Sequence, residues 1–232
     1  MTTTAIVALD VQTAEDALRI VDALGPSCHF YKVGLELFTA AGPSVVTRVL
    51  ERGNQVFLDL KLHDIPNTVR GAAKSAAALG ARLLTVHAIG GAAMVEAAVE
   101  GAGANLGILA VTVLTSFDDA SLASATGRPN VSAKKEVARL AEVAANARAH
   151  GIVCSGAEAA GMHERYGDRL ALLVPGIRMS GGASHDQKRV ITPSGAAAAG
   201  ARYIILGRAV TTAVDPRAAM ETVLSDLASL PV

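Results

Sequence analysis

The sequence predicts an α/β protein, folded as a single-domain (β/α)8 TIM barrel. Short apolar runs alternate with alanine-rich, helix-like stretches, and the alternation repeats eight times in 232 residues. Near-continuous apolar strands joined by helices indicate a parallel sheet whose outer face is covered. Eight such units fit a closed barrel better than an open, doubly wound Rossmann-like sheet, which is the alternative fold.

The eight strand candidates are short runs rich in Val, Ile and Leu. Each is followed by a polar residue, a glycine or a helix-like stretch, as expected for strands that cross a buried sheet and then turn. They span residues 6–9, 31–35, 56–60, 83–87, 108–114, 152–154, 170–174 and 203–206.

Helix signals lie between these runs. Residues 13–24 begin with Thr13 as a candidate N-cap, and Glu15 and Asp16 place negative charge in the first turn. Residues 45–52 form a second amphipathic stretch, which Gly53 is expected to end. The remaining connections follow the same strand-then-helix order.

No Pro/Ser-rich linker or shift in composition divides the chain, so residues 1–232 are expected to form one catalytic barrel domain. Two connections are longer than the few residues usual in such folds, at about 116–133 and 176–187. They follow the fifth and seventh strand candidates, and we expect them to act as lid loops.

Composition excludes several classes of function. Lys plus Arg and Asp plus Glu number 21 each, so overall charge favours neither nucleic acid nor an anionic membrane as a partner. The N-terminus has neither a basic leader nor a long apolar run, so we expect a cytoplasmic protein without a membrane segment. Cys28 and Cys154 have no metal-ligand spacing and are expected to be buried, reduced thiols.

Polar residues at the carboxyl ends of the strands are the candidates for chemistry, because barrels build their active sites there. Histidines at strand ends are more often structural than catalytic, so His63, His87 and His185 are given no catalytic role. The strand-end candidates are Asp10, Lys32, Asp59, Lys61, His87, Thr115, Ser155, Arg178 and Arg208.

One stretch stands out, Phe-Leu-Asp-Leu-Lys-Leu-His-Asp-Ile-Pro-Asn-Thr at residues 57–68. Asp59 and Lys61 alternate with the period of a strand, so both side chains point from the same face into the barrel mouth. An Asp-x-Lys pair by itself is equally consistent with an ordinary ion pair at a strand end. The full stretch of residues 57–68 is more specific than this pair alone.

That string resembles the signature of the orotidine 5′-monophosphate decarboxylase family, Asp-x-Lys-x-x-Asp followed by Ile-Pro-Asn-Thr. One departure is Met179, where the family often has proline after Pro-Gly-Ile-Arg. Further matches lie in the family's order at Leu9-Asp10, Tyr31 to Gly34, Leu114 to Ser116, Val174 to Arg178, Asp186 to Arg189, and Gly207 to Ala209.

The resemblance implies decarboxylation of orotidine 5′-monophosphate to uridine 5′-monophosphate and carbon dioxide, in de novo pyrimidine biosynthesis, without cofactor or metal. Asp59, Lys61 and Asp64 would form an alternating charged array in which Lys61 protonates C6 of the product. Asp64 would come from the partner subunit of a homodimer.

The resemblance also implies the residues that bind this nucleotide. Asp10 and Lys32 would hold the ribose hydroxyls, with Thr68 reaching one of them across the dimer interface, and Thr115 would bind the pyrimidine edge. Arg178 is left with two readings, ligand contact or support of its loop. The substrate-binding set is completed by Ile65, Pro175 and Arg178, and by three residues near the 5′-phosphate, Gln187, Gly207 and Arg208.

Two other functions remain open. Mg²⁺-dependent sugar-phosphate decarboxylases and aldolases of the same superfamily share the Asp-x-Lys-x-x-Asp core, although Lys61 between carboxylates argues against a bound cation. A non-catalytic nucleotide-binding barrel is the third reading. It has little reason to hold two carboxylates near an anionic ligand, because that arrangement is electrostatically costly.

Overall fold

The computed structural model describes residues 2–179 and 191–229. Eight parallel strands close into a barrel in sequence order, and β1 pairs with β8. The predicted (β/α)8 fold is therefore confirmed, and the open sheet is excluded. The strands are β1 Thr4–Ala8, β2 Phe30–Gly34, β3 Gln55–Leu62, β4 Leu83–His87, β5 Gly107–Val111, β6 Gly151–Val153, β7 Ala171–Val174 and β8 Ala201–Leu206.

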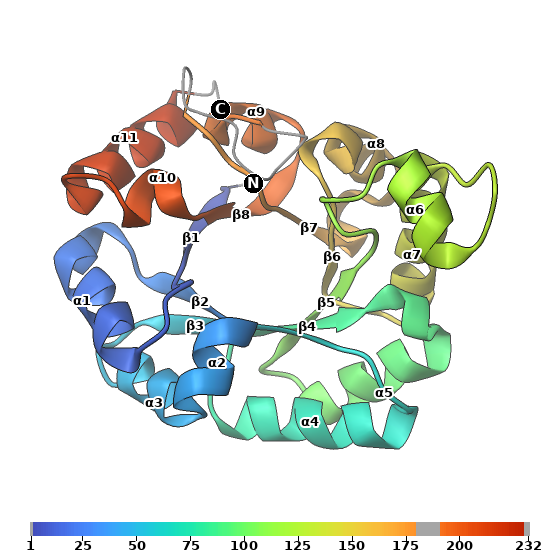
Figure 1. Ribbon diagram of the computed structural model, residues 1–232, viewed down its shortest axis with the longest axis horizontal. Helices are drawn as coiled ribbons and strands as arrows, with labels where there is room; N and C mark the ends of the chain where they lie inside the picture. The colour runs from blue at the N-terminus through green and yellow to red at the C-terminus, as the bar shows by residue number, and fades with distance from the viewer. Residues whose placement is uncertain (1, 180–190, 230–232) are drawn as a thin grey trace.

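Helices surround the barrel on its outer side (Figure 1). Together they cover strands whose outward-facing side chains are apolar, which explains why the strands form continuous hydrophobic runs in the sequence. The helices are α1 Ala14–Leu24, α2 Leu35–Ala41, α3 Ser44–Leu50, α4 Pro66–Ala78, α5 Ala92–Ala102, α6 Asp119–Thr126, α7 Ala133–Asn146, α8 Gly156–Tyr166, α9 Pro193–Ala198, α10 Arg208–Thr211 and α11 Pro216–Ala228.

Two hydrophobic clusters follow from the alternation of side chains along each strand. The larger cluster lies between strands and helices and includes Val7, Val33 and Leu58. The smaller cluster fills the barrel interior, so the barrel is packed rather than hollow. Its buried members are Ile6, Ala8, Phe30, Phe57, Leu83, Leu109, Leu173 and Ile205.

The predicted helix boundaries agree with the structure at α1 and differ near α2 and α3. Thr13 caps α1 by accepting a hydrogen bond from the Asp16 amide at 3.1 Å, as its sequence position indicated. The stretch expected at 45–52 is α3, which ends at Leu50, three residues before Gly53. The helix α2 was not predicted, because its first residue, Leu35, was assigned to the end of the second strand candidate.

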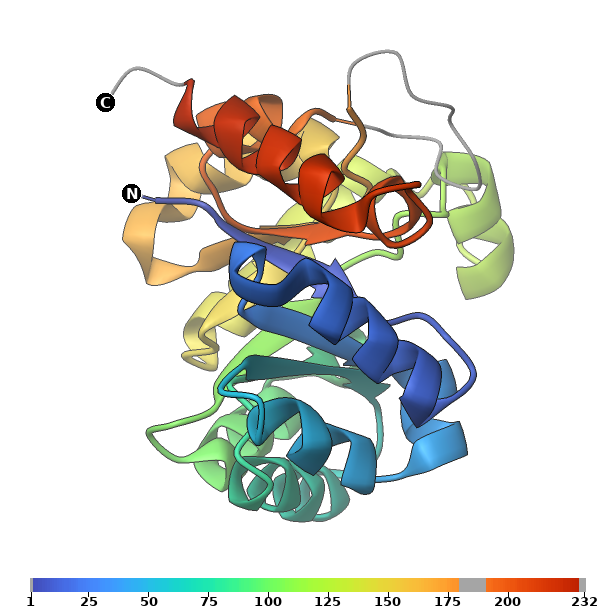
Figure 2. The same cartoon turned by 90° about the vertical axis from the view of Figure 1, so that its left-hand side faces the viewer.

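The fifth strand is shorter than expected, and the connection after it is partly helical. Extended pairing in β5 stops at Val111, and α6 lies within residues 116–133. Asp119 accepts a hydrogen bond from the Ala133 amide at 2.8 Å, and Arg128 lies 3.3 Å from the Glu136 carboxylate. Figure 2 shows α6 at the end of the barrel toward which the strands point, so this connection stands at the barrel mouth, tied to α7.

Within residues 2–179 and 191–229, none of the helices combines the length and the hydrophobicity that crossing a bilayer would require.

Removing a side chain from the barrel interior should test how far this packing stabilises the fold. Leu109 is fully buried in the interior cluster, so Leu109→Ala should lower the free energy of unfolding by about 2–5 kcal/mol. Val214 is fully exposed, so a similar aliphatic truncation there, Val214→Ala, should change the free energy of unfolding by no more than about 0.5 kcal/mol. Urea unfolding followed by circular dichroism at one protein concentration would measure both; equal effects would contradict the interior assignment.

Candidate functional site

A cavity of about 300 Å³ opens at the carboxyl ends of the strands. One side carries the charged side chains that follow β1 or lie on β2 and β3, and the other side is apolar. This is the end of the barrel where active sites form. The cavity is lined by Asp10, Lys32, Phe57, Asp59, Lys61, Val111, Val113, Leu114, Thr115, Val153, Leu173, Pro175 and Ile205.

Lys32 on β2 occupies the middle of the charged side. Its ammonium lies 2.7 Å from Asp10 Oδ1 and 3.6 Å from Asp59 Oδ2. The Lys32 side chain is only 9% exposed, whereas Asp10 stands in the open mouth. A buried ammonium requires such partners, because an unpaired charge removed from water is costly. Lys32 therefore links the mouth of the cavity to its interior.

Gly34 makes room for that link. A Cβ atom at this position would stand 2.9 Å from Lys32 Nζ and 3.1 Å from Asp10 Oδ1. Any side chain would therefore push the lysine or the aspartate aside. The absence of a side chain at the end of β2 is part of the site.

Asp59 and Lys61 on β3 form the second part of the charged array. Lys61 Nζ donates to Asp59 Oδ1 at 2.8 Å, and the Asp59 side chain is 14% exposed. The two ammonium groups of Lys32 and Lys61 thus approach the two different oxygens of one carboxylate. The period-two spacing that predicted a shared face corresponds to this geometry.

The electrostatics of Asp59 combine opposing effects. Burial by itself would raise the pKa of Asp59, but the charges of Lys32 and Lys61 and hydrogen bonds from Lys61 and Thr85 outweigh it and hold the pKa below its usual value. Asp59 is therefore ionised at neutral pH. The cavity presents a fixed negative charge with two cations beside it.

His63 and His87 lie next to this array, with ring centroids 5.9 Å apart. Burial, followed by electrostatic interaction with His63 and with the Lys61 ammonium, lowers the pKa of His87 below its usual value. His87 is therefore neutral at pH 7. Neither histidine lines the cavity.

Asp64, Ile65 and Thr68 do not reach the cavity of their own chain. They lie after β3 at the start of α4, and all three are exposed. Asp64 Oδ1 accepts a hydrogen bond from the Ile65 amide at 2.6 Å, and the apolar Ile65 is 67% exposed. Of the expected array, a single chain brings together Asp59 and Lys61 without Asp64.

The expected phosphate-side residues lie after β7 and β8. The Arg178 amide donates to the Ile191 carbonyl at 3.0 Å, and its guanidinium donates to the Ile177 carbonyl at 2.9 Å. Arg178 thus contacts the chain on both sides of residues 180–190. Gly207 and Arg208 begin α10, and a Cβ at Gly207 would meet open space. Gln187 lies outside the described residues.

Gly34, Thr85 and the apolar side of the cavity, called here the apolar wall, were not predicted as parts of the site. Thr85 lies two residues before His87 and shares its face, but a threonine inside an apolar strand gave no signal of function. Of the wall residues, Val113 follows β5 and Val153 ends β6. The alternation of strand side chains could have identified the wall, because every second residue faces the interior.

These residues are poorly suited to a divalent cation. Hard cations need several free oxygen ligands, whereas both oxygens of Asp59 face lysine ammonium groups. Among residues 2–179 and 191–229, no three His, Cys, Asp or Glu side chains gather as a metal site would require. The donor set suits an anionic ligand better than a metal. Cys28 and Cys154 are buried elsewhere.

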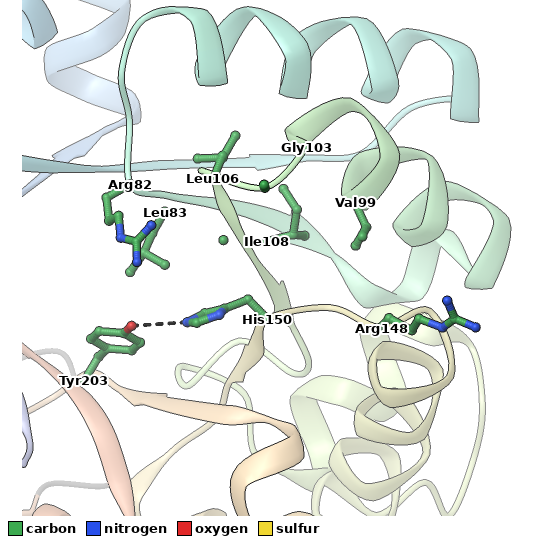
Figure 3. Close-up of a pocket in the computed structure, with 11 residues that line it drawn as sticks. Arg82, Leu83, Val99, Gly103, Leu106, Ile108, Arg148, His150 and Tyr203 are labelled. Atoms are coloured by element: carbon green, nitrogen blue, oxygen red, sulfur yellow. Dashed lines mark hydrogen bonds between the residues drawn. The ribbon is translucent and has the colours of Figure 1, made fainter. Parts of the chain in front are cut away.

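A second cavity, of about 270 Å³, lies at the opposite end of the barrel. Figure 3 shows Arg82 and Arg148 on two sides of it, and His150 hydrogen-bonded to the Tyr203 hydroxyl at 3.1 Å. Burial and the charges of Arg202 and Arg82 lower the pKa of His150. No carboxylate lines this cavity, so it lacks the acid–base pairing found at the mouth. The two cavities have similar volumes and differ in the charged residues that line them.

Comparison with known proteins supports the expected family resemblance. The model of the orotidine 5′-phosphate decarboxylase / HUMPS family matches residues 3–223. The chain is 51% identical over 222 residues to orotidine 5′-phosphate decarboxylase of Anaeromyxobacter sp. (strain K), covering 95% of this chain and 96% of the relative. The corresponding protein of Alkalilimnicola ehrlichii is 48% identical over 228 residues, covering 97% of this chain and 96% of the relative.

Solved structures agree with these relatives. The crystal structure of orotidine 5′-phosphate decarboxylase from Lactobacillus acidophilus superposes with a TM-score of 0.86 at 38% identity, covering 97% of this chain and 99% of that one. The protein of the same name from Pyrococcus horikoshii OT3 gives a TM-score of 0.79 at 27% identity, covering 98% and 100%. The family resemblance stated from residues 57–68 is confirmed.

The low pKa of Asp59 predicts how stability depends on pH. Asp59→Asn should lower the free energy of unfolding by about 2 kcal/mol at pH 7, because Lys32 and Lys61 lose their shared counter-ion. A depressed folded-state pKa contributes stability above the unfolded pKa of about 3.9, and that contribution is lost as pH falls through the folded value. The difference between wild type and variant should hold down to about pH 4 and shrink below it. Urea titrations across this range would measure it; a difference independent of pH would contradict the pairing.

Proposed function

The chain belongs to the orotidine 5′-phosphate decarboxylase / HUMPS family, and we propose that its barrel mouth decarboxylates orotidine 5′-monophosphate through the Asp59–Lys61 pair. It is an orotidine 5′-phosphate decarboxylase, a carboxy-lyase that produces uridine 5′-monophosphate and carbon dioxide. The observation that carries the mechanism is the Lys61 ammonium held 2.8 Å from an ionised Asp59 beside an apolar wall.

The chemistry explains why a lysine is needed. When the C6 carboxylate leaves as carbon dioxide, the electron pair of the broken bond stays in the plane of the pyrimidine ring, where no π-system accepts it. A fixed positive charge can stabilise that carbanion, and it acts most strongly where water is excluded. Lys61 supplies the charge and then transfers a proton from Nζ to C6. The apolar wall lowers the local polarity around this step.

Asp59 plays two parts in the proposal. It keeps Lys61 aimed through the 2.8 Å hydrogen bond, and it lies beside the substrate carboxylate. Two like charges about 4 Å apart repel by roughly 4 kcal/mol at an effective dielectric of 20. Loss of carbon dioxide relieves that repulsion, so part of the binding free energy from distant groups favours the reaction. Lys32 limits the cost of the buried carboxylate by pairing with its other oxygen.

The rest of the nucleotide would extend from this pair across the mouth. Asp10 and Lys32 are placed to bind ribose hydroxyls, and Thr115 to bind the pyrimidine edge near Pro175. The 5′-phosphate would lie against Gly207 and Arg208, where open space and a guanidinium suit an anion. Gln187 would bridge phosphate and pyrimidine. Arg178, whose amide donates to the Ile191 carbonyl, would either contact the ligand or support its loop.

We also propose that the active enzyme is a homodimer in which each mouth receives Asp64, Ile65 and Thr68 from the partner. These residues are exposed in one chain and do not line its own cavity. Two large apolar side chains, Ile65 and Ile89, follow the adjacent strands β3 and β4 and are both more than half exposed, as an uncovered interface would be. Asp64 would complete the alternating charged array around Lys61. With a soluble nucleotide as substrate, the enzyme would act in the cytoplasm.

The direct test follows the ultraviolet absorbance of purified protein mixed with orotidine 5′-monophosphate and excess EDTA. Wild type should turn over in the presence of the chelator, and Lys61→Ala should lose at least about 10³-fold in kcat. Lys135, an exposed residue of α7 that does not line the cavity, provides the matched control, Lys135→Ala, which should match wild type. Turnover only of a sugar phosphate with Mg²⁺ would assign the metal-dependent lyase. Tight nucleotide binding without turnover would assign a binding protein.

Mixing two inactive variants tests the shared site. A heterodimer of Lys61→Ala and Asp64→Ala chains has one mouth with both lesions and one mouth with neither. The mixture should therefore recover about a quarter of wild-type activity when subunits exchange freely. A mixture of Lys61→Ala and Asp59→Ala should recover nothing, because these residues come from the same chain. Absence of recovery in the first mixture, with exchange shown by mass spectrometry, would place Asp64 in its own chain's site.

A further inference from the structure

The backbone at Lys61 departs from an ordinary strand. Lys61 has φ of 48°, in the left-handed region that residues other than glycine rarely adopt. The pairing of β3 with β4 is irregular at the same place, because Leu58 is opposite Leu84 whereas Leu62 is opposite Val86. Between these two pairs the chain moves on by four residues in β3 but by only two in β4, which makes this part of β3 a bulge. This bulge contains both Asp59 and Lys61.

Thr85 occupies the gap that the bulge leaves in the hydrogen-bond ladder. Its hydroxyl oxygen accepts from the Lys61 amide at 2.9 Å and donates to Asp59 Oδ1 at 3.0 Å. One side-chain oxygen therefore replaces a strand carbonyl for Lys61 and also orients the carboxylate to which Lys61 Nζ donates. Thr85 is 1% exposed and does not line the cavity.

We propose that Thr85 is the positioning residue of the catalytic pair: its buried hydroxyl holds the Lys61 backbone and the Asp59 carboxylate in one arrangement. It acts through these two groups and touches no substrate atom. A left-handed residue in a strand costs free energy and persists only where surrounding contacts fix it. The hydroxyl is such a contact, since it satisfies an amide that the bulge would leave without a ladder partner.

Geometry also explains why the hydroxyl matters more than the shape of the side chain. Valine has the shape of threonine but cannot accept from the Lys61 amide or donate to Asp59. With valine at position 85, the amide would lose its acceptor, and the carboxylate would lose one of the donors that fix its rotation. Small displacements of this kind reduce turnover more than binding, because the reacting geometry is narrow.

The inference rests on the proposed function for its kinetic test. Thr85→Val should lower kcat by about tenfold or more while KM changes by less than about threefold, and Thr85→Ser, which keeps the hydroxyl, should stay within about threefold of wild type. Thr112 is a matched control: it is also buried, and its hydroxyl donates to the Val153 carbonyl at 2.8 Å. Thr112→Val removes a buried hydroxyl without touching the pair and should leave kcat near the wild-type value.

A second readout does not depend on substrate. The Thr85 hydrogen bond helps to hold the pKa of Asp59 down, so Thr85→Val should raise that pKa, measured by carbon NMR of the Asp59 carboxyl with Asp59→Asn as the assignment control. In a pH–rate profile the acid limb should move to higher pH, because Asp59 must be ionised. Thr85→Ser and Thr112→Val should show neither change.

The outcomes separate the two proposals. If wild type does not decarboxylate the nucleotide, the proposed function fails, and the NMR titration still tests Thr85. If wild type turns over and Thr85→Val matches it in kcat and in the Asp59 pKa, the positioning role is overturned. Equal losses in Thr85→Ser and Thr85→Val would overturn it as well, since the hydroxyl would then not be the operative group.

Discussion

The site depends on one carboxylate with several partners. Asp59 Oδ1 accepts hydrogen bonds from Lys61 Nζ and from the Thr85 hydroxyl, and Asp59 Oδ2 forms an ion pair with Lys32. A carboxylate this deep is tolerable only because cations and donors surround it, and those groups are themselves held there by its charge. Adjacent strands β2, β3 and β4 supply the partners, so the order of strands in the barrel places the array.

The barrel explains how such an array can be rigid. Strand backbones on both sides fix the directions of Asp59 and Lys61, and Leu58 and Phe57 anchor the same strand into the outer and inner cores. Charged groups held in place by a packed framework need little reorganisation when charge develops on a ligand. Loops therefore need to supply only residues that recognise and enclose the nucleotide.

Much of this arrangement could be predicted from the sequence, because it follows from periodicity. Apolar runs of strand length identified all eight strands, and period two placed Asp59 and Lys61 on one face. The left-handed conformation of Lys61 could not be predicted, because it depends on register against β4, a property of two strands together. Thr85 was missed because a threonine inside an apolar strand gives no signal of function, and its bond to the Lys61 amide depends on the same register. The helix at Leu35–Ala41 was missed because its first residue, Leu35, was assigned to the end of the second strand candidate.

The packed interior of the barrel has a consequence for molecular traffic. Phe57, Leu173 and Ile205 form part of the floor of the mouth cavity, and Leu83 of the same buried cluster lines the cavity at the opposite end. A layer of buried apolar side chains thus lies between the mouth cavity and the cavity at the opposite end. A nucleotide therefore cannot pass along the barrel axis, so release of one product molecule on the mouth side must precede arrival of the next substrate.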